Sequence, residues 1–84
     1  MLKLSKKADY GLMAVRHLAV HDADGACSAA DIAESYGIPV PLLAKVLQKL
    51  AKNGLVVARH GSSGGYRLAR DPSTISALEV INAI

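Results

Sequence analysis

The middle of this 84-residue chain constrains the fold most, because it places the end of one helix directly before the start of another. Ser28 is suited to cap a helix. Gly37 supplies a left-handed C-terminal stop. Pro41 fits the first position of a following helix, where its missing N–H costs nothing. We therefore predict helices over residues 28–36 and 41–53, joined by a rigid turn, which is the arrangement of a helix-turn-helix.

The apolar spacing of these two helices predicts the faces that they bury. Ile32 and Tyr36 lie one turn apart and are expected to point inward, with the small Ala33 where the helices cross closely. Ile38 is expected to pack under the turn. The inward face of the second helix is predicted to comprise Leu43, Val46, Leu47 and Leu50.

The opposite face of the second helix is cationic or amide throughout. It carries Pro41, Lys45, Gln48 and Lys52, with Leu42 and Lys49 on one flank. A structural helical hairpin would more often mix signs and form salt bridges one turn apart. We therefore favour a helix that faces DNA over a merely solvated one, with Pro41, Leu42, Lys45 and Gln48 nearest the base edges. Gln48 can bond an adenine, whereas Leu42 can contact only a thymine methyl.

Charge is distributed unevenly along the chain. No carboxylate lies between Glu34 and Asp71, and the formal net charge is +3. That stretch holds Lys45, Lys49, Lys52, Arg59, Arg67 and Arg70. A confined positive field favours a polyanion, because each contacted phosphate releases condensed counterions. The alternative interpretation is a solvated helix and strand that happen to be basic.

A β-hairpin is predicted over residues 55–70. Its strand-like segments, 55–60 and 66–69, are joined by a glycine-rich turn that can approach a minor groove closely. The residues expected around the tip are Arg59, His60, Ser62 and Ser63. Arg67 is assigned to phosphates together with Lys49 and Lys52. A hairpin without contacts is the alternative, and the pattern of a phosphate-binding P-loop is absent.

Two further helices complete the domain. The first is predicted over residues 5–21, with Ser5 as its cap and an apolar face of Ala8, Leu12, Val15 and Ala19. Gly11 in its middle suggests a close helix–helix approach. The last is predicted over residues 76–84 and is opened by a capping box of Ser76 and Glu79.

The apolar stripe of the last helix runs to the final residue. Its members are Ala77, Val80, Ile81 and Ile84. A helix whose apolar face is still continuing predicts a longer protein and an exposed surface for a partner. We accordingly expect a dimer whose interface lies largely outside this stretch.

The whole chain, residues 1–84, is predicted to form one domain that is mainly α with a small β-hairpin, a winged helix-turn-helix. Its length suffices for one modest core. No apolar run approaches a membrane span, and the N-terminus lacks the features of a signal peptide. Cys27 is the single cysteine, so neither a disulfide nor a C-x-x-C metal knuckle is predicted. We expect a cytoplasmic protein.

Catalytic and metal sites have little support in the sequence. His17 and His21 lie one turn apart, a spacing that can hold a metal ion, but no third ligand is evident and a surface pair is favoured. Ser62 and Ser63 have His60 nearby but lack an orienting carboxylate. We expect no enzyme. The rival function is a winged helix that binds protein, which the lysines disfavour because protein interfaces deplete them.

The sequence resembles the bacterial winged-helix regulators of the Rrf2 family, which contains the iron–sulphur regulator IscR, the nitric-oxide sensor NsrR and the cysteine regulator CymR. The likeness covers essentially the whole chain and is carried by residues 4–11, 30–33, 42–50, 53–56, 64–69 and 75–84. It implies a sequence-specific double-stranded DNA-binding transcription regulator, repressor or activator, that acts as a homodimer on a palindromic operator. It also implies a recognition helix in the major groove and a wing in the minor groove.

The chain departs from that family in two respects. Sensing members carry three cysteines in a long dimerisation helix, and Cys27 does not match those ligands. No cofactor is therefore expected in this segment, and an iron–sulphur cluster in a longer chain is an analogy only. The family often places Arg at the wing position of His60, so Arg59 is the alternative minor-groove contact.

Overall fold

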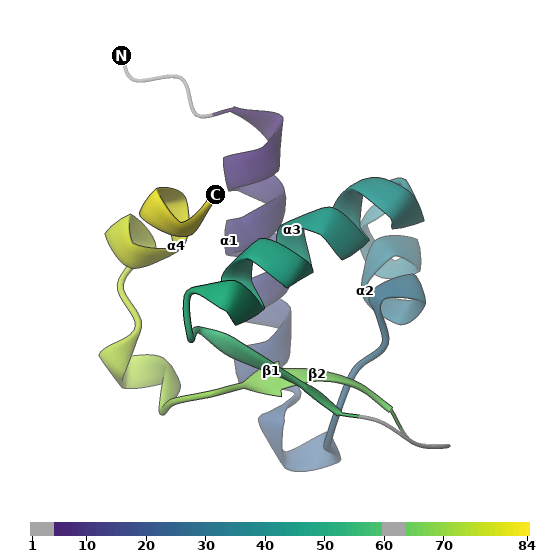
Figure 1. Ribbon diagram of the computed structural model, residues 1–84. Coiled ribbons are helices and arrows are strands. Elements are labelled where there is room, and N and C mark those ends of the chain that lie inside the picture. The colour runs from purple at the N-terminus through teal and green to yellow at the C-terminus, as the bar shows by residue number, and fades with distance from the viewer. Residues whose placement is uncertain (1–4, 60–63) are drawn as a thin grey trace.

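Four α-helices and a β-hairpin surround one core in a computed structural model that describes residues 5–59 and 64–84 (Figure 1). Helix α3 crosses in front of α1, with α2 and α4 on opposite sides of it and the hairpin at its C-terminal end. The elements are α1 (Lys6–Val20), η1 (Asp22–Asp24), α2 (Ala29–Tyr36), α3 (Val40–Lys52), β1 (Val56–Arg59), β2 (Gly65–Leu68), η2 (Pro72–Thr74) and α4 (Ala77–Ala83). No helix within these described ranges is long and apolar enough to cross a membrane.

Serine caps begin three of the helices, as predicted. Ser5 Oγ accepts the N–H of Ala8 at 3.1 Å, and Ser28 Oγ accepts the N–H of Asp31 at 3.0 Å. At α4 the capping box is complete: Ser76 Oγ accepts the N–H of Glu79 at 3.1 Å, and Glu79 Oε1 accepts the N–H of Ser76 at 3.3 Å. These bonds satisfy N–H groups that have no partner within the helix.

The turn between α2 and α3 differs from the prediction by one residue. Gly37 takes the predicted left-handed conformation, with φ of 65°. However, α3 begins at Val40 with Pro39 as its N-cap, so Pro41 is the second helical residue and not the first. The shift costs no hydrogen bond, because the N–H of the second position is also free of an intrahelical acceptor. The third helix ends at Lys52, followed by Asn53 as its C-cap.

The core is centred on the inward face of α3. Its four predicted residues, Leu43, Val46, Leu47 and Leu50, are at most 1% exposed. Ile32 and Ala33 of α2 are equally buried, and Ile38 is buried under the turn. The prediction that Tyr36 points inward was wrong. The residue is 43% exposed, and its hydroxyl forms a hydrogen bond with His17 Nδ1 at 3.0 Å. Its polar tip has a partner at the surface, so the ring lies across α1 and does not enter the core.

The buried face of α1 also differs from the predicted one. Its buried residues are Ala8, Gly11, Ala14 and Leu18, whereas Leu12 and Val15 are half-buried beside the core. Three of these four buried residues are small, Ala8, Gly11 and Ala14, and small side chains let α3 and α4 approach α1 closely. A Cβ at Gly11 would collide with the side chain of Ile84, which confirms the predicted close approach at this glycine.

The apolar stripe predicted for α4 is divided between the core and the surface. Val80 is 1% exposed, and Ile84 is half-buried against the core at Gly11. Ile81 is half-buried, and Ala77 is exposed. Leu78, outside the predicted stripe, is 65% exposed. The partner surface expected at this helix stays a prediction.

The hairpin is antiparallel, and its register runs from Val56 opposite Leu68 to Arg59 opposite Gly65. Strand β1 lies within the predicted segment 55–60, and β2 begins and ends one residue before the predicted segment 66–69. Cys27 forms a β-bridge on the other edge of β2. Its N–H donates to the Tyr66 carbonyl at 3.0 Å, and the Tyr66 N–H donates to the Cys27 carbonyl at 2.7 Å. The part of β2 nearer the hairpin tip is thus tied to the segment before α2.

Candidate nucleic-acid interface

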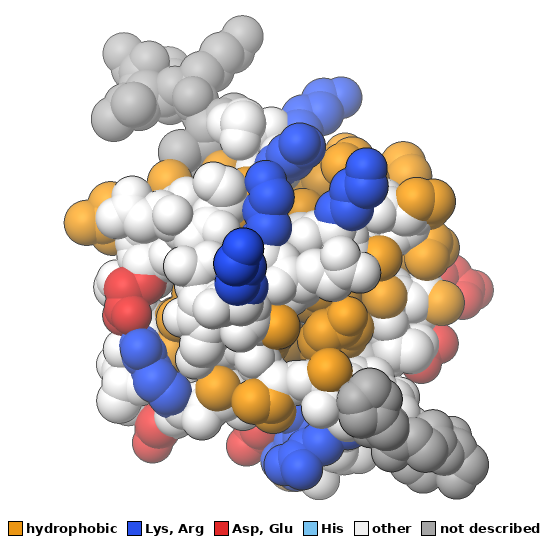
Figure 2. Space-filling view, in the orientation of Figure 1, with side chains coloured by type: hydrophobic (Ala, Val, Ile, Leu, Met, Phe, Trp, Pro, Cys, Tyr) orange, Lys and Arg blue, Asp and Glu red, His pale blue; other side chains and the backbone are white. Residues whose placement is uncertain are grey.

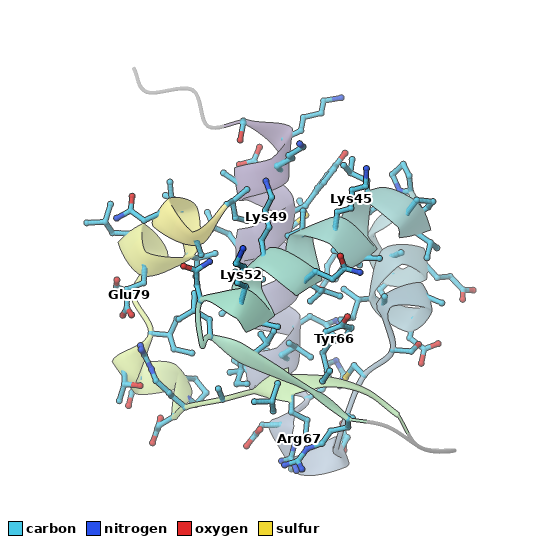
Figure 3. All side chains as sticks on the ribbon, viewed as in Figure 1. Lys45, Lys49, Lys52, Tyr66, Arg67 and Glu79 are labelled. Carbon is cyan, nitrogen blue, oxygen red and sulfur yellow. The ribbon has the colours of Figure 1, made fainter. Side chains whose placement is uncertain are left out.

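Three lysines project from one side of α3. Lys45, Lys49 and Lys52, which we call the α3 lysine face, are exposed and follow one another at helical spacing (Figure 3). Lysine side chains gather on this side of the molecule, and acidic side chains lie toward the rim of the same view (Figure 2). This surface has the concentrated positive charge that a polyanion requires.

Within residues 5–59 and 64–84, no acidic side chain pairs with a lysine of this face. The ion pairs among the described residues join His21 to Asp24, Arg67 to Asp22 and Arg70 to Glu79, and none includes a lysine of α3. Lys49 and Lys52 lie in the last turn of α3, where positive charge also complements the helix dipole. That local effect does not account for Lys45, which lies near the middle of the helix.

The remaining predicted contacts of α3 surround the lysines. Pro41 and Gln48 are exposed, and Leu42 is half-buried. Val40 is 44% exposed at the N-terminal end of the helix, where residues reach deepest into a groove in this docking mode. Sequence reasoning missed Val40 because a valine between two prolines was assigned to the turn.

The hairpin contributes a less complete surface. Arg59 is exposed at the end of β1, as a wing contact requires. His60, Ser62 and Ser63 lie outside the described residues, so their contacts stay predictions. Tyr66 lies between the hairpin and α3 in Figure 3 and is half-buried against the core, so it joins the two predicted contact elements.

Two basic residues of the acid-free stretch are paired within the chain. Arg67 Nη2 donates to the Asp22 carbonyl at 2.9 Å and approaches Asp22 Oδ1 at 3.3 Å. It lies at the η1 end of the molecule, away from the α3 lysines (Figure 3). Arg70 Nη2 donates to both carboxylate oxygens of Glu79 at 3.0 Å. The stretch without carboxylates is thus partly neutralised by acids that the fold brings in from outside it.

Glu79 is held as a carboxylate by two neighbours. The N–H of Ser76 and then the Arg70 guanidinium lower the pKa of its side chain below the ordinary value. Asp71 behaves similarly at η2, where the N–H and hydroxyl of Ser73 lower its pKa. Both carboxylates bind groups of their own segment or Arg70, and among the described residues neither pairs with a lysine of the α3 lysine face.

The described residues do not fit an iron–sulphur cluster. Such clusters take several thiolate ligands, and this chain has one cysteine, Cys27. Burial, with help from Asp24 and Asp31, raises the pKa of the Cys27 thiol, which favours its protonated form. Within residues 5–59 and 64–84, no group of three His, Cys, Asp or Glu side chains is placed to hold a metal ion.

Comparison with known proteins matches residues 4–84 to the Rrf2 family model, described as an iron-dependent transcriptional regulator. IscR of Yersinia enterocolitica is 39% identical over 83 residues, covering 99% of this chain and 51% of the relative. The structure of T. potens IscR superposes with a TM-score of 0.92 at 40% identity, covering 99% of this chain and 61% of that one. CymR of B. subtilis, the global cysteine regulator, gives 0.94 at 34% identity, covering 99% and 64%.

The chain spans about half the length of the curated relatives that it matches. It corresponds to their N-terminal portion, and its fold is their winged helix-turn-helix: mainly helical with a two-stranded antiparallel hairpin. The family comprises transcriptional regulators and not enzymes. With helices, hairpin and sequence all in agreement, the chain belongs to the Rrf2 family of transcriptional regulators.

Proposed function

We propose that this chain binds double-stranded DNA sequence-specifically, with α3 in the major groove and the hairpin in the minor groove. One observation carries the proposal: the α3 lysine face is exposed and forms no ion pair among the described residues. A positively charged helix preceded by a tight turn is the element that such domains insert into DNA.

The α3 residues are assigned to two roles. Those nearest the N-terminal end of the helix and its outer midline, Pro41, Leu42, Lys45 and Gln48, face base edges. Lys49 and Lys52 bind phosphates and so position the domain without reading sequence. Val40 joins the first group, because it is exposed beside Pro41.

The hairpin supplies the second contact. Arg59 and His60 are proposed to enter the minor groove, with Ser62 and Ser63 beside them. A basic side chain is favoured in a narrow, strongly negative A·T minor groove. Arg67 is proposed as a phosphate contact, which requires its guanidinium to leave Asp22 or to share it.

The proposed regulator is a homodimer on a palindromic operator, as a repressor or an activator. A two-fold dimer places two recognition helices about one DNA turn, ~34 Å, apart. Since α1 covers Val80 and Ile84, the surface that α4 offers a second copy is centred on Leu78.

A salt titration of duplex binding tests the proposed function. The logarithm of the binding constant should fall linearly with the logarithm of salt concentration, by about 0.9 for each phosphate contacted. The titration is run on a selected sequence and on a random duplex of the same length. A slope near zero on both would contradict DNA binding and favour the rival function, a protein-binding winged helix.

A further inference from the structure

Two histidines at the end of α1 share an arrangement that the proposed function does not use. His17 and His21 are one helical turn apart, and their ring centroids are separated by 4.3 Å. The backbone N–H of His21 donates to the His17 carbonyl at 3.0 Å, which holds the two positions on one face. Imidazole nitrogens bound to one metal ion stand about 3.3 Å apart, so neighbouring rings at this separation can converge on it.

Each ring already uses its Nδ1 atom. His21 Nδ1 lies 3.1 Å from Asp24 Oδ2, and His17 Nδ1 lies 3.0 Å from the hydroxyl of Tyr36. A carboxylate accepts but does not donate, so the Asp24 contact selects the form of His21 that carries its proton on Nδ1. The Nε2 atom of His21 then carries a lone pair that can bind a metal ion.

Metal-binding histidines are normally oriented in this way. Their second ring nitrogen donates to a carboxylate or another oxygen, which fixes the ring and raises its basicity. Here both oxygens come from other elements: Asp24 from η1 and Tyr36 from the end of α2. The pair is therefore held from two sides, unlike a pair of free surface side chains.

We propose that the Nε2 atoms of His17 and His21 bind one divalent transition-metal ion of the class that prefers imidazole, such as Zn²⁺ or Cu²⁺. Water completes the coordination, since within the described residues no third protein ligand is placed to join them. The site is separate from the α3 lysine face and requires no cysteine.

Thermal unfolding of the chain with added ZnCl₂ provides the main test. At a Zn²⁺ concentration of 100 times the Kd, the ratio of folded to unfolded protein rises about 100-fold. In a chain of this size this is a rise of roughly 15 °C in Tm. His17→Ala and His21→Ala should each remove the rise. His60→Ala and Cys27→Ser are the matched controls and should keep it.

The oxygens that orient the rings give a second, more specific readout. Asp24→Asn and Tyr36→Phe should each weaken Zn²⁺ binding by about 10–100-fold, measured by calorimetry, while leaving one ion per chain. Electron paramagnetic resonance of the Cu²⁺ complex should show two equivalent nitrogen ligands. These measurements need only the metal-bound state, so they remain decisive if His17→Ala weakens the fold.

The proposal is overturned if the Tm does not rise with Zn²⁺, or if the rise survives both histidine substitutions. Loss of the rise in Cys27→Ser would also overturn it, because binding would then depend on the thiol. None of these results bears on DNA binding, which the salt titration tests separately.

Discussion

The basic residues of this chain fall into two groups that look alike in sequence and differ in space. The α3 lysine face has no acidic partner within the described ranges, whereas Arg67 and Arg70 are bonded to Asp22 and Glu79. Both groups belong to the same stretch without carboxylates. The difference teaches that a local excess of positive charge does not show which charges remain available to an external polyanion.

The chemistry of the two side chains matches their surroundings. A guanidinium is planar and pairs well with the two oxygens of a carboxylate, as Arg70 does with Glu79. An ammonium group is a compact charge on a flexible stem, and it can follow the phosphates of a duplex without a fixed geometry. In this chain Arg70 joins two structural elements through Glu79, and the α3 lysines form no ion pair among the described residues.

Replacing the whole α3 lysine face should have the largest effect on binding. The triple variant Lys45→Gln, Lys49→Gln, Lys52→Gln should flatten the plot of log K against log salt by about two units, one for each phosphate-binding lysine, and should also lose the base contact of Lys45. Its free energy of unfolding should change by less than about 0.5 kcal/mol for each exposed lysine. The matched control, Arg70→Gln, should lower stability while leaving the slope unchanged, because Arg70 pairs with Glu79 and has no proposed DNA contact. An equal loss of slope in the control would abolish the distinction between the two groups.

Local sequence signals predicted much of the fold. Ser5, Ser28 and Ser76 cap their helices as expected, and Gly37 ends α2. The inward face of α3 was also predicted residue by residue, because large aliphatic side chains at helical spacing have one place to go. The contacts of the site residues with DNA stay predictions.

Features that depend on a distant partner were not predictable from local patterns. The pairing of Arg67 with Asp22 joins residues 45 apart in sequence. The bridge from Cys27 to Tyr66 is similar, since nothing near Cys27 indicates a strand. On α1, burial of the small Gly11 displaced the predicted face, because apolar size does not report where helices approach closely.

Within the α3 surface, Gln48 separates base reading from charge. Gln48→Ala should lose about 1–3 kcal/mol of discrimination at one base pair, because a bidentate bond to adenine is removed. The salt slope should not change, since the side chain is neutral. Competition binding with single-base operator variants measures the loss. Equal weakening on specific and random duplexes would exclude a base-reading role.

The Arg70 pair depends on the capping box of α4, which fixes Glu79. Ser76→Ala should lower the free energy of unfolding by about 1 kcal/mol, because the N-cap bond is lost. DNA affinity should fall little, since α4 lies outside the α3 lysine face. Denaturant unfolding together with duplex titration measures both. A larger effect on DNA binding than on stability would show that α4 positions α3 directly.

Glu79 adds a pH dependence to this prediction. Its pKa is lowered in the folded state, so the stability it contributes is fully present above its unfolded value of about 4.3 and is lost as pH falls through the folded value. Glu79→Gln should therefore reduce the loss of stability in acid and leave DNA binding at neutral pH unchanged. Asp71→Asn is the matched control, because its pKa is lowered in the same direction by Ser73. If both variants lost stability in acid as the unsubstituted protein does, neither carboxylate would be responsible for the pH dependence.

Substitution of Arg67 is expected to change stability least, and it tests directly whether a paired arginine can also contact DNA. It is 37% exposed and its partner Asp22 is 51% exposed, so the pair should contribute only about 0.2–1 kcal/mol, and less at high salt. If the guanidinium stays with Asp22 on DNA, Arg67→Gln should change the salt slope by much less than Lys49→Gln, which should change it by about one. Asp22→Asn releases the guanidinium and tests the same contact from the other side. A loss of one full unit of salt slope in Arg67→Gln would show that Arg67 leaves Asp22 and binds a phosphate when the protein binds DNA.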